Sequence, residues 1–201
     1  MIIWRDGQWI ENPPQADDRG AHLGDGLFET ILWRDGKAVR LERHLERLAH
    51  SAQALGLTCP SLAHIHETMA ELARSNQMSG ERAAINLSLR ARGPRGLTRA
   101  SQDASLMLRI AAAPPQSAPL ALATVSIRRN ETAPSVRHKT LSYIDQIEAR
   151  REAHARGADE AAQLSTRGAW ACAAAGNLIF VIGGEALTPR IEDGALPGTV
   201  R

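Results

Sequence analysis

The stretch Ala111-Ala112-Ala113-Pro114-Pro115-Gln116-Ser117-Ala118-Pro119 constrains the fold of this chain most strongly. Proline cannot continue a helix or donate to a sheet ladder, so a proline-rich run of small residues interrupts regular structure. On either side of it the chain is long enough to build its own core. The sequence therefore predicts an N-terminal domain over 1–113, a linker over 114–119 and a C-terminal domain over 120–201.

The N-terminal part alternates between hairpin and helix patterns. Asp6-Gly7 and Asp35-Gly36 each lie between short apolar runs, which is typical of a two-residue hairpin turn. Apolar residues recur at helical spacing over 41–56, and a second amphipathic helix is predicted over 61–76. Strands are predicted at 2–4, 8–10, 27–33, 38–40, 83–90 and 105–110. This mixture predicts an α+β domain.

The C-terminal part repeats the mixture with shorter strands. A helix is predicted over 143–156, because Gly157 follows it as a helix-ending residue. Strands are predicted at 120–128, 161–164, 169–173, 178–182 and 186–188. We therefore expect a second α+β domain.

Composition excludes several classes of protein. Hydrophobic residues make up 43% of the chain and the net charge is +2, so nothing favours a nucleic-acid or membrane partner. No stretch has the length of a membrane span or the shape of a signal peptide. Cys59 and Cys172 are too few for a disulfide framework, which favours the cytoplasm. His64 and His66 are two residues apart and do not face each other on a helix, so we expect no metal site.

Lysine is rare in this chain. Of 24 basic residues only Lys37 and Lys139 are lysines. Lys37 follows the Asp35-Gly36 turn and is predicted to be a solvated hairpin residue. Lysine can lose its proton and form a Schiff base, whereas arginine stays charged. Lys139 is therefore nearly the only candidate for amine chemistry; its alternative is a lysine that pairs with a carboxylate at a strand end.

Nine short segments, taken in order, resemble one family. The segments are Asp18-Arg19-Gly20-Ala21-His22-Leu23-Gly24-Asp25-Gly26-Leu27-Phe28-Glu29-Thr30, His44-Leu45-Glu46-Arg47-Leu48, Arg92-Gly93-Pro94-Arg95-Gly96, Arg137-His138-Lys139, Ala149-Arg150-Arg151-Glu152-Ala153, Gly157-Ala158-Asp159-Glu160-Ala161, Asn177-Leu178-Ile179-Phe180, Thr188-Pro189 and Leu196-Pro197-Gly198-Thr199-Val200-Arg201. Together they resemble the class IV aminotransferases, the fold-type IV pyridoxal-phosphate enzymes. This family includes branched-chain and D-amino-acid aminotransferases and aminodeoxychorismate lyase.

The resemblance implies a cofactor site. Lys139 would form a Schiff base with pyridoxal 5'-phosphate and then move the Cα proton, as a partly desolvated lysine can. Arg47 would contact the cofactor phosphate, although a solvated helix arginine is the alternative. Tyr143 would meet the phenolic oxygen of the cofactor, or be a half-buried aromatic at a helix start. Gly198, Thr199 and Val200 would form the turn that holds the phosphate, or an ordinary proline-glycine turn.

Substrate binding is expected at Phe28, Arg92 and Arg95. An arginine in the 92–95 loop can receive a substrate carboxylate in a bidentate pair, and a mobile basic loop is the alternative. The resemblance implies amino acid and 2-oxo acid substrates and a homodimer.

Two departures from the family pattern bear on function. Cys172 stands where the family has a glutamate that pairs with the pyridine nitrogen of the cofactor. The chain also ends at Arg201, soon after the Leu-Pro-Gly turn, so the second domain is expected to be incomplete. The first hypothesis is a pyridoxal-phosphate aminotransferase. The alternatives are aminodeoxychorismate lyase, which releases pyruvate and 4-aminobenzoate, and a non-catalytic truncated relative.

Overall fold

The computed structural model describes residues 2–11, 18–94, 96–99, 102–113, 115 and 118–199. The chain divides into two compact units, residues 1–115 and 116–201, called unit 1 and unit 2 below. Each mixes helices and strands. Unit 1 contains β1 (Ile2–Arg5), β2 (Gln8–Glu11), α1 (Arg19–Leu23), β3 (Gly26–Arg34), β4 (Lys37–Ala38), α2 (Leu41–Ala54), α3 (Leu62–Ser75), β5 (Ala83–Ala91) and β6 (Ala104–Ala112).

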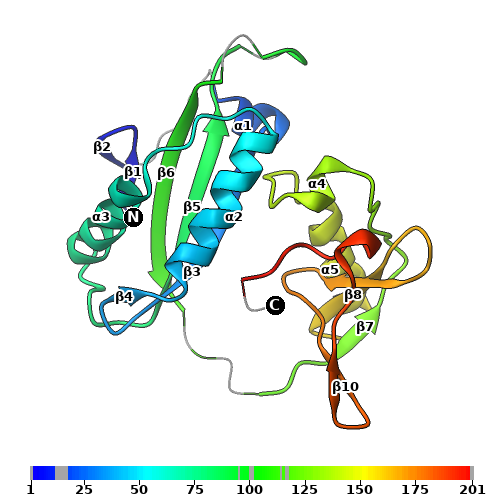
Figure 1. Ribbon diagram of the computed structural model, residues 1–201. Helices are drawn as coiled ribbons and strands as arrows, with labels where there is room; N and C mark the ends of the chain where they lie inside the picture. The colour runs from blue at the N-terminus through cyan, green and yellow to red at the C-terminus, as the bar shows by residue number, and fades with distance from the viewer. Residues whose placement is uncertain are drawn as a thin grey trace. The chain divides into compact units, whose positions relative to one another are not determined.

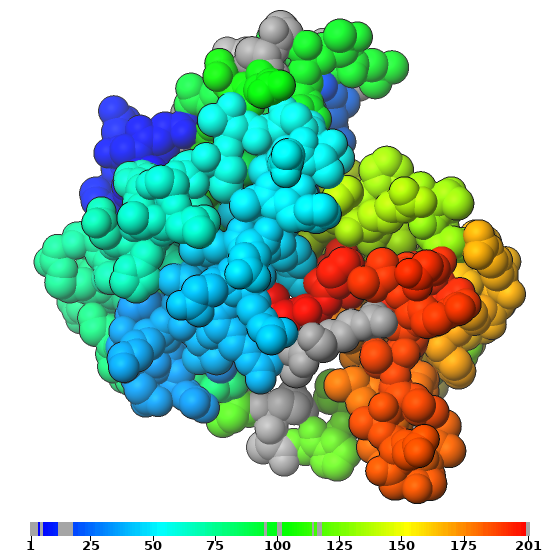
Figure 2. Space-filling view, viewed as in Figure 1, coloured from blue at the N-terminus to red at the C-terminus, as the bar shows by residue number. Residues whose placement is uncertain are grey.

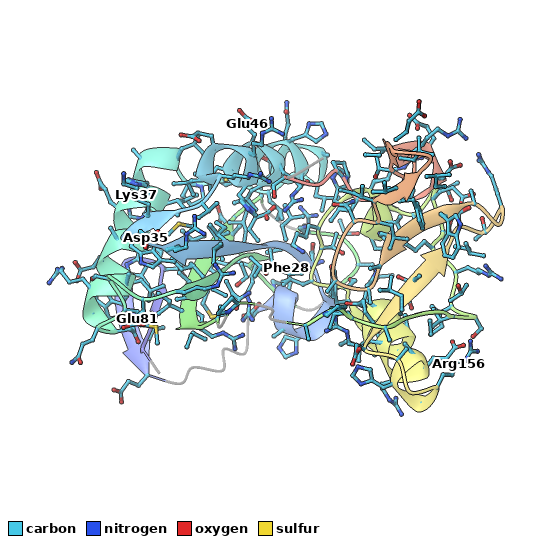
Figure 3. The ribbon with its side chains drawn as sticks, turned by 90° about the horizontal axis from the view of Figure 1, so that it is seen from below. Phe28, Asp35, Lys37, Glu46, Glu81 and Arg156 are labelled. Atoms are coloured by element: carbon cyan, nitrogen blue, oxygen red, sulfur yellow. The ribbon has the colours of Figure 1, made fainter. Side chains whose placement is uncertain are left out.

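The strands of unit 1 form one antiparallel sheet in the order β2-β1-β6-β5-β3-β4. Both predicted Asp-Gly hairpins are confirmed, because they connect β1 to β2 and β3 to β4. Asp35 and Gly36 have φ of 53° and 74°, and two positive values match the twist of a two-residue hairpin. Figure 3 shows Phe28 and, at the far end of β3, Asp35 and Lys37. Lys37 is exposed, as predicted.

Helices α2 and α3 lie along one side of this sheet (Figure 1). Alternate residues of β3, among them Leu27 and Ile31, are buried in the same apolar cluster as Leu45 and Leu48 of α2. Leucines and isoleucines on β5 and β6 complete that cluster. Burial of the helix-facing side of the sheet therefore fixes which face of β3 each residue occupies.

Leu87 is a suitable position for testing this core by substitution, because it lies on the central strand β5 and is 0% exposed. We expect Leu87→Ala to lower the free energy of unfolding by about 3 kcal/mol, because the smaller side chain leaves a cavity. Leu97→Ala is the matched control, because Leu97 is 98% exposed. Urea denaturation of both variants, followed by tryptophan fluorescence, measures the difference. Equal losses in the two variants would contradict this account of the core.

Unit 2 is built around a smaller sheet. Its elements are β7 (Leu122–Thr124), α4 (Pro134–Arg137), α5 (Ile144–Ala155), β8 (Glu160–Leu164), β9 (Trp170–Ala173), β10 (Phe180–Ile182), β11 (Glu185–Leu187) and the 3-10 helix η1 (Ile191–Asp193). Strand β8 pairs in parallel with β7 and antiparallel with β9, while β10 and β11 form a separate hairpin. Ala149 and Ala153 of α5 share a buried cluster with Ala161 of β8. These small side chains let the helix lie close to the strand.

Three helices were predicted within two residues of their ends, namely 41–56, 61–76 and 143–156.

The strand predicted over 120–128 is wrong in length, because β7 ends at Thr124. The Glu152 carboxylate on α5 accepts hydrogen bonds from the backbone N–H and the hydroxyl of Ser126, two residues after the end of β7. The strand predicted over 178–182 begins at Phe180. Helices α1, α4 and η1 were not predicted, since each is too short to show a period.

Apolar side chains are exposed on the β10–β11 hairpin, which reaches the surface in orange in Figure 2. Val181 is 75% and Ile182 63% exposed. Among the described residues, no helix combines the length and apolar character that crossing a membrane requires.

Candidate functional site

Lys139 and Tyr143 lie together in unit 2. Lys139 follows α4 and is half-buried, and Tyr143 is the N-cap residue of α5. The Lys139 Nζ lies 5.5 Å from the centroid of the Tyr143 ring, which is within cation–π range. The two residues predicted to meet the reactive part of a cofactor are therefore neighbours in space.

Three buried polar side-chain atoms in the described part of unit 2 have no hydrogen-bond partner. They are Thr140 Oγ1, Gln146 Oε1 and Gln163 Oε1. Thr140 adjoins Lys139, and Gln146 lies in the first turn of α5, directly after Tyr143. Nearly all buried polar groups in proteins are hydrogen-bonded, so the unsatisfied atoms of Thr140 and Gln146, which lie close to Lys139 and Tyr143 in the chain, fit a site that binds a polar molecule.

Cys172 is buried on β9, with 3% of its surface exposed. It is the register partner of Gln163 on the neighbouring strand β8. Directly opposed residues of an antiparallel pair project from the same face of the sheet. At the place where the family pattern has a carboxylate, this chain therefore presents a thiol with an amide beside it.

A hollow of about 260 Å³ runs along α5 of unit 2. Its lining residues are Tyr143, Gln146, Ile147, Arg150, Arg151, His154, Ala174 and Ala175.

Two buried glutamines of unit 2, Gln146 and Gln163, were not among the residues predicted from the sequence. For Gln163 the signal that could have found it is a glutamine among the small and apolar residues of a buried strand.

The turn predicted to hold a phosphate is fastened by Asn177. The Asn177 side-chain amide donates a hydrogen bond to the Leu196 carbonyl at 2.8 Å. Gly198 and Thr199 are half-buried. Among the described residues, no helix begins between the end of η1 and Thr199. Val200 lies outside the described residues. Asn177 belongs to the Asn-Leu-Ile-Phe segment noted in the sequence, and this contact gives that residue a physical role.

Arg47 belongs to unit 1 and lies on α2. Its Nε and Nη2 donate to the two carboxylate oxygens of Glu29 at 2.7 and 2.5 Å, and His44 Nδ1 lies 2.7 Å from the same carboxylate. Glu29 is 1% exposed. Burial alone would raise the pKa of the Glu29 carboxyl, but the hydrogen bonds and charges of Arg47 and His44 outweigh burial and hold the pKa below its usual value. Arg47 is thus held in place by a buried carboxylate.

The substrate candidates lie in or beside the sheet of unit 1. Phe28 is half-buried and neighbours Glu29 on β3, so the two side chains project from opposite faces of the sheet. The guanidinium of Arg92 forms an ion pair with the carboxylate of Asp6 in the first hairpin. Arg95 lies outside the described residues.

Sequence reasoning missed the residue that braces the loop around position 95. Arg19 is 4% exposed, and its Nη1 donates to the carbonyls of Pro94 and Gly96 at 3.0 and 2.6 Å. Its Nε donates to Asp25 at 2.8 Å. The signal was available, because Arg19 and Asp25 stand in the first segment that resembles the family.

The sequence-predicted site residues are divided between the units. Phe28, Arg47 and Arg92 belong to unit 1, and the described C-terminal candidates belong to unit 2. Those C-terminal candidates are Lys139, Tyr143, Cys172, Gly198 and Thr199. In unit 2 the structure brings Lys139 to Tyr143 and Cys172 to Gln163.

Comparison with known proteins gives consistent matches. Residues 26–201 match the family model described as Amino-transferase class IV. Aminodeoxychorismate lyase from Bacillus subtilis is 29% identical over 208 residues, which cover 100% of this chain and 71% of that protein. The crystal structure of a branched-chain aminotransferase from Thermoproteus uzoniensis with norvaline matches with a TM-score of 0.88 and 29% identity, covering 98% of this chain and 71% of that one. The PLP-bound form of a hypothetical aminotransferase from Mycobacterium tuberculosis matches with a TM-score of 0.84 and 26% identity, covering 99% and 74% of the two chains.

Proposed function

The chain belongs to the class IV aminotransferases, and from this premise we propose that it is a pyridoxal-phosphate-dependent enzyme that moves an amino group between an amino acid and a 2-oxo acid. The observation that carries the proposal is Lys139, which lies beside Tyr143 in the segment where the buried polar atoms of Thr140 and Gln146 have no hydrogen-bond partner. A similar structure holds the same cofactor, which supports its use here. Bound pyridoxal phosphate supplies an aldehyde and an aromatic ring that takes up electrons from the substrate.

The residues of the chain then have separate roles. Lys139 would hold the cofactor through its amine and would move the proton at the Cα atom of the substrate. Arg47, oriented by Glu29, is the phosphate-binding candidate of unit 1. The turn at Gly198, Thr199 and Val200 is the phosphate-binding candidate of unit 2. Tyr143 orients the cofactor through its hydroxyl.

The substrate carboxylate needs a cation, and the loop around positions 92–95 offers two. We propose that Arg95 and Arg92 receive it and that Phe28 lines the substrate side. Arg92 must leave Asp6 to do so, because the two form an ion pair in this structure.

Aminodeoxychorismate lyase is the second candidate, because a curated lyase aligns with the whole chain. A single assay series separates the two reactions. We expect amino-group transfer from an amino acid to 2-oxoglutarate, followed as glutamate formed, and little pyruvate from aminodeoxychorismate. Pyruvate release without dependence on a 2-oxo acid would assign the lyase instead.

A non-catalytic relative is the third candidate, and Cys172 at the glutamate position is the observation that favours it. A folded protein that fails to retain pyridoxal phosphate and catalyses neither reaction would establish this role. We further propose a homodimer and a cytoplasmic location. The family resemblance supports the homodimer, and the low cysteine content supports the cytoplasm.

A further inference from the structure

We propose that Gln163, and not Cys172, is the side chain that contacts the pyridine nitrogen of bound pyridoxal phosphate. The inference rests on the proposed function and adds to it the identity of the group that faces the electron-accepting ring. It concerns unit 2 alone, where Gln163, Cys172 and Lys139 all lie.

The sheet register places the two candidates side by side. Gln163 on β8 is paired with Cys172 on β9. On the same face, Ala161 and Ala174 pack in the cluster that includes Ala149 of α5. Gln163 is two residues from Ala161, so it also projects toward α5. A group that approaches Cys172 from this face therefore meets the Gln163 amide as well.

The position of Gln163 along β8 brings it level with the first turn of α5, the helix that Tyr143 caps. Helix α5 ends at Ala155 and the chain reverses into β8 at Glu160, so the start of α5 lies beside the end of β8. The path from Gln146 to Ala155 is roughly 14 Å of helix, and the path from Glu160 to Gln163 roughly 10 Å of strand. Gln163 thus lies close to the level of the first turn of α5, directly after Tyr143.

Gln163 has an acceptor that nothing in the described structure uses. Its side chain is 0% exposed, its Nε2 donates to the Ile127 carbonyl at 3.4 Å, and its Oε1 has no partner. An unsatisfied buried carbonyl oxygen is costly, and a bound N–H donor would remove that cost. The hydrogen bond to Ile127 orients the amide so that the oxygen is the atom left to accept.

The chemistry of the two side chains favours the amide. A thiol is a weak hydrogen-bond acceptor, whereas an amide oxygen is a good one. A protonated pyridine nitrogen donates one hydrogen bond, which Gln163 Oε1 can accept. Because the amide is neutral, it holds that proton less strongly than a carboxylate would, so the ring of this protein is a weaker electron acceptor.

The test compares two cofactors that differ only at the ring nitrogen. Dissociation constants are measured by fluorescence titration for pyridoxal phosphate and for its 1-deaza analogue, in which a C–H group replaces the nitrogen. We expect wild type to prefer pyridoxal phosphate by about tenfold, the effect of one hydrogen bond to a charged group. Gln163→Leu should lose this preference, and Cys172→Ala should keep it. Gln163→Glu, which preserves side-chain shape, should increase it.

Other results would overturn the inference. If Gln163→Leu weakened the binding of both cofactors by the same factor, the role of Gln163 would be packing alone. If Cys172→Ala removed the preference, the thiol would be the partner. If folded wild type bound both cofactors equally, the inference would fail while the proposed function stood; if it bound neither, both would fail. Gln163→Glu keeps the test decisive where Gln163→Leu does not fold, because an unchanged preference in Gln163→Glu also overturns the inference.

Discussion

Lys139→Ala is expected to abolish the covalent attachment of pyridoxal phosphate and to lower amino-group transfer by about 10³-fold or more. Two functions are lost together, because the same amine bonds to the cofactor and moves the substrate proton. An arginine elsewhere cannot replace it, since a guanidinium does not lose its proton in proteins. The measurement is borohydride reduction in the presence of pyridoxal phosphate, followed by mass spectrometry of the digested protein.

The chain provides a matched control for this experiment, because it contains only one other lysine. Lys37 is exposed on the β3–β4 hairpin of unit 1. We expect Lys37→Ala to leave both the attachment and the rate of transfer unchanged. A stable adduct in Lys139→Ala, or an adduct on Lys37 in wild type, would contradict the assignment of Lys139.

Much of the fold follows from patterns that the sequence displays locally. The repeating apolar residues of α2 and the Asp35-Gly36 pair each act over a few positions, so periodicity and turn chemistry were sufficient to predict them. The length of β7 could not be predicted in the same way. It depends on pairing with β8, a strand that is distant in the sequence.

The candidate site residues also divide into those that a local pattern predicts and those that depend on contacts between distant elements. Lys139 could be singled out by composition and resemblance. The surroundings of Arg47 could not, because Glu29 reaches it only when α2 packs on β3. The pairing of Gln163 with Cys172 also depends on strand register, which no local pattern in either strand specifies. Contacts between elements therefore carry the information that sequence reasoning lacked.

Glu29→Gln is expected to lower the free energy of unfolding by about 3–5 kcal/mol near neutral pH, as the loss of one partner of a buried ion pair does. The amide preserves the volume of the side chain, so the loss comes from the uncompensated charge of Arg47 and the lost hydrogen bonds. Glu71→Gln is the control, because Glu71 pairs with Arg74 on the exposed side of α3. We expect no measurable change in that variant. Urea midpoints of the three proteins provide the comparison.

The pH dependence of this difference has a definite sign. The pKa of Glu29 in the folded protein lies below its ordinary value of 4.5. The folded state therefore favours the charged carboxylate, and its stabilisation is fully present above about pH 4.5. As the pH falls from there through the folded pKa, both states bind the proton and the stabilisation is lost. The difference in unfolding free energy between wild type and Glu29→Gln should accordingly narrow as the pH falls below about 4.5. A difference that stays constant as the pH falls would show that the ionisation of Glu29 does not stabilise the folded state, and Arg47 would then need another source of orientation.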